Sequence, residues 1–138
     1  MNAWAQQFVE AFDSHDGTRV AALVAQDIGW EDVAARITFD SPEALAAFVG
    51  VSDAFSNDYR FTLVSEQVSE NCYAVEWEMA GTNTGAFQGG APTNRSFCIR
   101  GVSVGSFDAD GKIKVNRDYY NVAELVQQLR GDVTDSQS

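Results

Sequence analysis

Hydrophobic residues near the start of the chain recur at helical spacing. Trp4, Phe8 and Phe12 stand four residues apart, so they share one face of an α-helix over residues 3–12. Capping residues crowd positions 14–18 and predict a break in this helix. The apolar residues that follow predict a second helix, which begins near Val20 and ends near Gln26.

A third helix has a strong start signal. Ser41 suits the N-cap, Pro42 suits the first helical position, and Glu43 places an acid in the first turn. Apolar residues at helical spacing carry this helix to about Phe55. Before it, residues 28–37 alternate irregularly and predict one or two short strands.

From Tyr59 onward the pattern changes to alternation of apolar and polar residues, which is the period of a strand with one buried face. Asp108-Ala-Asp-Gly111 predicts a hairpin turn, and Asn121 is placed to cap a short terminal helix that stops at Gly131. The strands are predicted over residues 59–68, 72–84, 96–107 and 112–120.

The order of these elements indicates the fold class. Helices come first, then an antiparallel meander, then one short helix. Segregated elements of this kind predict an α+β domain with helices on one face of a curved sheet. We expect a single domain over residues 1–131 and a polar tail over residues 132–138.

Composition and charge exclude several classes of partner. The chain has 138 residues, with 9 basic and 20 acidic side chains and a net charge of −11. Such a negative surface repels phosphate backbones, so nucleic acid is not an expected partner. No stretch approaches the ~20 apolar residues of a membrane span, and the N-terminus does not resemble a signal peptide. We therefore expect a cytoplasmic protein, with Cys72 and Cys98 as reduced thiols.

Five segments of the chain form a recognisable set: I28-G-W-E-D32, S41-P-E-A-L-A-A-F48, V75-E-W-E-M-A-G-T-N-T-G85, R100-G-V-S-V104 and D110-G-K-I-K-V-N-R-D-Y-Y-N121. Together they resemble the SnoaL-like polyketide cyclases, which belong to the nuclear transport factor 2-like, or cystatin-like, superfamily. The resemblance covers roughly residues 3–130. It implies a cone-shaped cup in which a curved sheet wraps a long N-terminal helix.

A weaker similarity links the chain to limonene-epoxide hydrolases. Both groups of relatives place an acid/base aspartate at the position of Asp118. The hydrolases also carry an Arg-x-Asp pair where this chain has Glu76 and Glu78, so the arginine of their triad is missing. Trp30 stands in place of their water-positioning tyrosine, and Asp32 in place of an asparagine.

Asp118 is the first catalytic candidate. Asp is uncommon in strands, and a carboxyl group that faces an apolar cup has a raised pKa. Such a group can take a proton from carbon and return it to oxygen, as an aldol cyclisation requires. The alternative is a solvated strand carboxylate paired with Arg100 or Arg117.

Asp32 and Glu78 are the further catalytic candidates. Asp32 would act as a partner acid, or alternatively cap a turn. Glu76 and Glu78 share one strand face, which could equally be turned to water. Arg100 would bind a substrate oxyanion or form a structural ion pair. His15, the only histidine, is expected to be a cap or surface residue.

The expected ligand is a hydrophobic, oxygen-bearing small molecule. We hypothesise a cofactor-free cyclase or isomerase, with an epoxide hydrolase or a non-catalytic binding domain as alternatives. One histidine and no suitable Cys spacing indicate no metal site, and by resemblance the protein is expected to form a homodimer. The substrate-binding candidates are Phe12, Trp30, Phe48, Phe55, Glu76, Arg100 and Tyr120.

Overall fold

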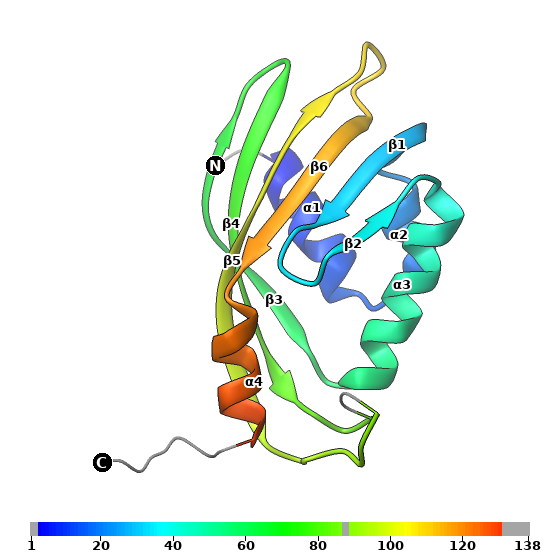
Figure 1. Cartoon of the computed structure of the whole chain (residues 1–138). Coiled ribbons are helices and arrows are strands. Elements are labelled where there is room, and N and C mark those ends of the chain that lie inside the picture. The colour runs from blue at the N-terminus through cyan, green and yellow to red at the C-terminus, as the bar shows by residue number, and fades with distance from the viewer. Residues whose placement is uncertain (1–2, 87–88, 131–138) are drawn as a thin grey trace.

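The computed structural model describes residues 3–86 and 89–130 (Figure 1). The tail predicted over residues 132–138 and the helix stop at Gly131 lie outside the described residues. The elements are α1 Ala3–Asp13, α2 Gly17–Ala21, β1 Val24–Asp32, β2 Ile37–Phe39, α3 Pro42–Phe55, β3 Arg60–Val68, β4 Cys72–Thr82, β5 Ser96–Phe107, β6 Ile113–Tyr120 and α4 Val122–Arg130.

The six strands form one sheet in the order β2-β1-β6-β5-β4-β3. Strands β3 to β6 are the predicted antiparallel meander. Strand β1 pairs with β2 in an antiparallel hairpin and with β6 in parallel. The sequence did not predict this parallel pair, because it joins segments from opposite ends of the chain.

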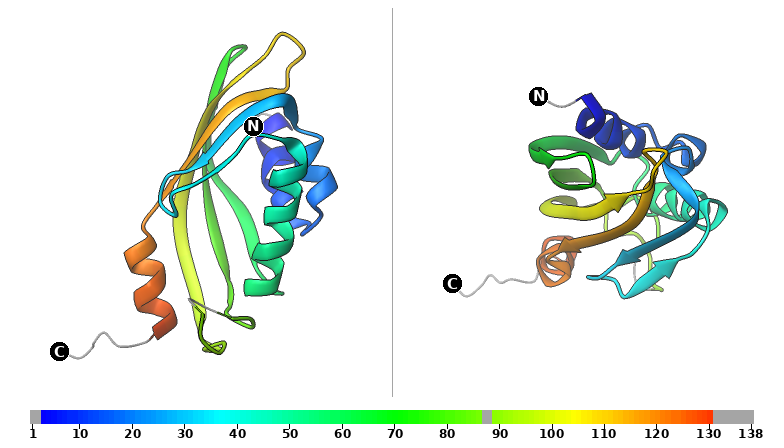
Figure 2. Two further views of the ribbon diagram at one scale, coloured as in Figure 1. Left: turned by 45° about the vertical axis from the view of Figure 1, so that its right-hand side comes forward. Right: turned by 90° about the horizontal axis from the view of Figure 1, so that it is seen from above.

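The sheet is curved, and helices α1, α2 and α3 lie along its concave side (Figures 1 and 2). The expected α+β cone is therefore confirmed. The core lies between α1 and the inner sheet face, where Phe8 and Trp30 stack with ring centroids 6.3 Å apart. Trp4 packs against Tyr73 and Phe107 at the other end of α1.

Three helix starts follow the local sequence. The Asp16 carboxylate accepts the Thr18 N–H at the start of α2. The Ser41 hydroxyl accepts the Ala44 N–H at the start of α3, and the Asn121 side chain accepts the Glu124 N–H at the start of α4. Each bond satisfies a backbone donor that has no partner within its helix.

The predicted second helix is too long. Helix α2 ends at Ala21, and residues 24–26, for which the sequence pattern predicts helix, begin β1 instead. Val24 is buried and pairs with Ile113 of β6. Tertiary pairing therefore overrides the local helical pattern.

Helix α4 covers one end of the cone. Leu129 is completely buried against Tyr59 and Phe97 in a second small core. In this part of the sheet β6 has already ended, so α4 packs beside the free edge of β5 (Figure 1). Within the described residues, no helix is long and apolar enough to cross a bilayer.

Candidate active site

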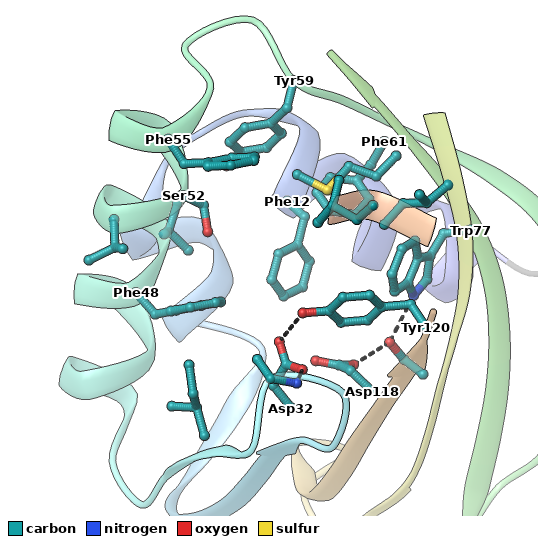
Figure 3. A pocket seen from close by; sticks show the side chains of 18 of the residues that line it. Phe12, Asp32, Phe48, Ser52, Phe55, Tyr59, Phe61, Trp77, Asp118 and Tyr120 are labelled. Atoms are coloured by element: carbon teal, nitrogen blue, oxygen red, sulfur yellow. Dashed lines mark hydrogen bonds between the residues drawn. The ribbon is translucent and has the colours of Figure 1, made fainter. Parts of the chain in front are cut away.

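A pocket of about 310 Å³ lies inside the cone, between the inner sheet face and α3 (Figure 3). Its walls come from α1, α3, α4 and every strand of the sheet. Most of the lining side chains are apolar, and many are aromatic: Phe8, Phe12, Trp30, Phe48, Phe55, Tyr59, Phe61, Trp77, Phe97 and Tyr120.

Two carboxylates lie side by side at the polar end of this pocket. Asp32 ends β1 and Asp118 lies on β6, and the parallel register makes them direct partners. Partners in adjacent strands project from the same sheet face. Figure 3 shows the two carboxyl groups facing each other below Phe12.

Three donors converge on Asp118. Its Oδ1 accepts the Ser103 hydroxyl at 2.6 Å and the Asn116 amide N–H at 2.8 Å. Its Oδ2 accepts the Trp30 indole N–H at 2.8 Å. The residue is half-buried, and it lines the pocket, so its accessible part faces the cavity.

Burial raises the pKa of Asp118 to about 6. The hydrogen bonds from Ser103, Asn116 and Trp30 act in the opposite direction because they stabilise the charged form. The neighbouring Asp32 carboxylate raises the pKa further. Asp118 can therefore both bind and release a proton near neutral pH.

Asp32 is buried and has its own donors. Its Oδ1 accepts the Ala35 N–H at 2.9 Å, which is the turn-capping bond, and its Oδ2 accepts the Tyr120 hydroxyl at 3.0 Å. Burial raises the pKa of Asp32 although both bonds favour its charged form. Burial also raises the pKa of Tyr120, so its phenol remains a donor.

The structure does not bring Glu76, Glu78 and Arg100 to the pocket. On β4 the inner face carries Tyr73, Val75, Trp77 and Met79, and the alternation of the strand turns both glutamates to the outer face. Glu78 lies 3.7 Å from the Arg100 guanidinium there, and Glu76 accepts the Ser65 hydroxyl. The expectation that Glu76, Glu78 and Arg100 belong to the site is therefore wrong, because none of the three lines the pocket.

The other sequence candidates do line the pocket: Phe12, Trp30, Asp32, Phe48, Phe55, Asp118 and Tyr120. Ser103 and Asn116, which bind Asp118, were missed. Their signal was present in the alternation, because Asn116, Asp118 and Tyr120 occupy every second position of β6 and share its inner face. In the described part of the chain no group of three or more His, Cys, Asp or Glu side chains could hold a metal ion.

Solved structures with the same cone identify the fold. A ketosteroid isomerase-like protein from Catenulispora acidiphila, solved in complex with trimethylamine, is 16% identical over 94% of both chains, with a TM-score of 0.81. AclR, a candidate hydroxylase from Streptomyces galilaeus, is 21% identical over 96% of this chain and 82% of its own, with a TM-score of 0.80. IdmH, a candidate polyketide cyclase from Streptomyces antibioticus, is 21% identical over 91% and 94%, with a TM-score of 0.77.

These likenesses define the class as a ketosteroid isomerase-like, or nuclear transport factor 2-like, α+β cone. The family follows from the sequence itself. The profile of the SnoaL-like domain matches residues 5–116, and the chain belongs to that family. No curated protein matches the sequence.

Proposed function

We propose that this protein is an acid/base enzyme that needs no cofactor and acts on a hydrophobic, carbonyl-bearing small molecule as a cyclase or isomerase. One observation carries the proposal: two adjacent carboxyl groups form the polar end of an otherwise apolar pocket. SnoaL-like domain membership supports this class of chemistry without naming a substrate.

In the proposed reaction Asp118 is the general base. Neighbouring carboxylates repel each other, so the charge of Asp32 favours the protonated form of Asp118. Ionised Asp118 takes a proton from a C–H next to the ligand carbonyl. Asp32 stays ionised, because the Ala35 N–H and the Tyr120 hydroxyl both donate to it, and its charge favours proton uptake by Asp118. Protonated Asp118 then gives the proton to the oxygen on which negative charge develops.

The pocket walls suit a flat, apolar ligand. Aromatic side chains from α1, α3 and β3 to β6 offer ring faces on several sides of the cavity. A volume of about 310 Å³ is at the small end of the range for ligand pockets, which favours a compact ring system. Proton transfer between carbon and oxygen changes no oxidation state, so Asp118 can perform it without a redox cofactor.

The test measures proton transfer directly, because both cyclases and isomerases of this type must perform it. A bicyclic β-dicarbonyl probe, 2-acetyl-1-tetralone, is incubated with the protein in D₂O. Loss of its acidic C–H signal is followed by NMR. We expect wild-type protein to accelerate the exchange and Asp118→Asn to lower the rate about 100-fold or more.

Phe48→Leu serves as the control, since it alters the pocket wall and leaves both carboxyl groups in place. Equal exchange rates for wild type and Asp118→Asn would contradict the proposal. Binding of the probe without exchange would favour a non-catalytic binding domain. Hydrolysis of 1,2-epoxytetralin without exchange would favour the epoxide hydrolase alternative, against which the outward-facing Glu76 and Glu78 argue.

We also propose that the protein forms a homodimer through the outer face of β5 and β6. Apart from α4, no helix in the described part of the chain covers this face (Figure 2). Val102 and Val104 lie on this outer face because Ser103 between them faces inward. Tyr119 of β6 pairs with Val102 and lies on the same face. Sedimentation velocity is expected to show a dimer for wild type and a monomer for Val104→Asp, and a monomeric wild type would contradict the proposal. We also propose that the protein is cytoplasmic. Cys72 and Cys98 are free cysteines, which suit a reducing compartment.

A further inference from the structure

Two buried aromatic side chains stand behind the donors that hold Asp118. The Trp77 indole N–H donates to the Ser103 hydroxyl oxygen at 2.9 Å. The Tyr73 hydroxyl donates to the Asn116 side-chain oxygen at 2.5 Å. All four of these side chains are less than a tenth exposed, so water does not compete for their hydrogen bonds.

We call the hydrogen-bond chain from Trp77 through Ser103 to Asp118 the Trp77 relay, and its donors all point toward Asp118. An indole N–H can only donate, so the Ser103 oxygen must accept from it. The single Ser103 proton is then directed to Oδ1 of Asp118. If Ser103 turned to accept a proton from that oxygen, its own proton would lose Oδ1, which is its only hydrogen-bond acceptor among the described residues.

The Tyr73 relay is the hydrogen-bond chain from Tyr73 through Asn116 to Asp118, and its donors also point toward Asp118. Within the described part of the chain, Asn116 is the only hydrogen-bond partner of the Tyr73 hydroxyl. If the Asn116 amide were reversed, its N–H would face the phenol, and the buried Tyr73 proton would be left without an acceptor. An unpaired buried donor costs about 1–3 kcal/mol, so Asn116 keeps its N–H toward Asp118.

Strand β5, which pairs with β4, has glycines at the two positions opposite the rings of Trp77 and Tyr73. Gly101 and Gly105 flank Ser103 on the inner face of β5 and pair with Trp77 and Tyr73. A Cβ at Gly101 would lie 2.3 Å from the Trp77 ring, and one at Gly105 would lie 2.4 Å from the Tyr73 hydroxyl.

The segment Gly101-Val-Ser-Val-Gly105 has the letters of a nucleophile-elbow motif, G-x-S-x-G. It lies within a continuous strand, however, and not on the strand-to-helix turn that such a nucleophile requires. The glycines instead make room for the rings of Trp77 and Tyr73.

We propose that Tyr73 and Trp77 are positioning residues that confine the exchangeable proton of Asp118 to Oδ2. Both relays make Oδ1 a hydrogen-bond acceptor only. Oδ2 receives one bond, from Trp30, and it is the oxygen turned toward Asp32 (Figure 3). This inference deepens the proposed function, on which it rests, by assigning a single oxygen of Asp118 to proton transfer with the ligand.

The test follows the Asp118 carboxyl carbon by ¹³C NMR during a pH titration and needs no substrate. In Tyr73→Phe, Asn116 is free to reverse and accept a proton from Oδ1. In Trp77→Phe, the Ser103 hydroxyl loses the bond that holds its orientation and can turn its proton away from Oδ1. Each change favours the protonated form, so we expect each variant to raise the titration midpoint of Asp118 by about 0.5–1 pH unit.

Tyr59→Phe is the matched control. It removes the same hydroxyl group from another buried tyrosine of the pocket wall. Among the described residues, the rings in contact with Tyr59 are those of His15 and Phe61, which are not members of the Asp118 relays. We expect no shift from this substitution. If Trp77→Phe does not fold, Ser103→Ala breaks the same relay with a much smaller change in volume and is expected to raise the midpoint likewise.

A second readout reports which oxygen holds the proton. With the proton on Oδ2, Oδ1 is a carbonyl that accepts two hydrogen bonds, which lowers its infrared stretching frequency. We expect that frequency to rise in Tyr73→Phe and Ser103→Ala and to stay constant in Tyr59→Phe. Midpoints and frequencies that move no more than in Tyr59→Phe would overturn the inference. Because neither readout depends on turnover, such a result is separate from a failure of the exchange assay.

Discussion

His15 illustrates how one side chain can join three segments. Its Nδ1 lies 2.6 Å from the Asp53 carboxylate of α3, and its Nε2 lies 2.7 Å from the Tyr59 carbonyl oxygen ahead of β3. The ring also stacks on the Tyr59 ring at 3.7 Å. The expectation of a cap or surface residue is therefore wrong, since the side chain is only 19% exposed.

Both partners of His15 are acceptors, and only the protonated imidazole can donate to both, so this geometry favours the charged form. Burial lowers the pKa of His15, but the bonds to Tyr59 and Asp53, together with the nearby Asp13 carboxylate, raise it overall. Arg60 forms an ion pair with Asp13 at 2.8 Å, which weakens the influence of the Asp13 carboxylate on the pKa of His15.

The raised pKa of His15 predicts a pH-dependent contribution to stability. This contribution is fully present below the unfolded-state pKa of about 6.5, and it is lost as the pH rises through the folded-state value. His15→Asn keeps a residue that tolerates the positive φ of 62° at this position and removes the charge. We expect urea unfolding to show that the variant loses about 1–2 kcal/mol more at pH 5 than at pH 9.

The Asp118 carboxyl titrates in the same pH range, but it is present in both proteins and cancels from this difference. Asp53→Asn provides a control, because it removes the partner and should reduce the same pH dependence. A destabilisation by His15→Asn that is equal at both pH values would contradict a charged His15 in the folded protein.

At the level of elements, β5 depends on small residues opposite large rings. Gly101→Ala places a methyl group against the Trp77 ring, which is buried and cannot move aside without displacing its neighbours. We expect a loss of about 1–3 kcal/mol in the free energy of unfolding, measured in urea.

Gly29→Ala is the matched strand control. A Cβ at Gly29 of β1 would meet no atom within 4 Å. Alanine there restricts the unfolded chain, so the change is expected to be neutral or to stabilise by up to about 1 kcal/mol. Equal losses from the two substitutions would show that crowding at Trp77 is not the cause.

The Gln128 side chain joins helix α4 to the sheet by forming the pair of hydrogen bonds that a neighbouring strand would form with Cys98. The Gln128 amide donates to the Cys98 carbonyl oxygen at 2.9 Å and accepts the Cys98 N–H at 2.7 Å. It thereby satisfies the edge of β5 where β6 is absent.

Removing this bridge should loosen α4 in particular. We expect Gln128→Ala to speed amide hydrogen exchange at Cys98 and along α4, with a cost of about 1 kcal/mol. Gln127→Ala, at an exposed position of the same helix, should leave both unchanged. Unaltered exchange at Cys98 in Gln128→Ala would contradict the assigned role of the bridge.

At the level of the whole molecule, charge repulsion opposes the compact state. The net charge is −11, and acidic residues outnumber basic ones by 20 to 9. Added salt screens this repulsion, so we expect the melting temperature at pH 7.5 to rise by about 3 °C between 0.05 and 0.5 M NaCl. Near the isoelectric point, about 4.2, the rise should disappear. A melting temperature that falls with NaCl at pH 7.5 would contradict this view.

The sequence by itself determined most of the elements. Alternation predicted the strands of the meander, and caps such as Ser41 and Asn121 predicted helix starts, because these signals depend on neighbours a few residues away. Alternation also indicated that Glu76 and Glu78 face opposite to Trp77. The family resemblance placed them near the pocket, and the local pattern was the better guide.

Only the tertiary structure decided the site. Asp32 and Asp118 become neighbours through the parallel pairing of β1 with β6, which no local pattern specifies. The donors of Asp118 are fixed by rings that cross from β4 to the glycines of β5. A local period shows which side of a strand is buried. The identity of the strand beside it depends on the packing of the whole chain, and here that packing gives Asp118 its pocket, its partner carboxylate and its raised pKa.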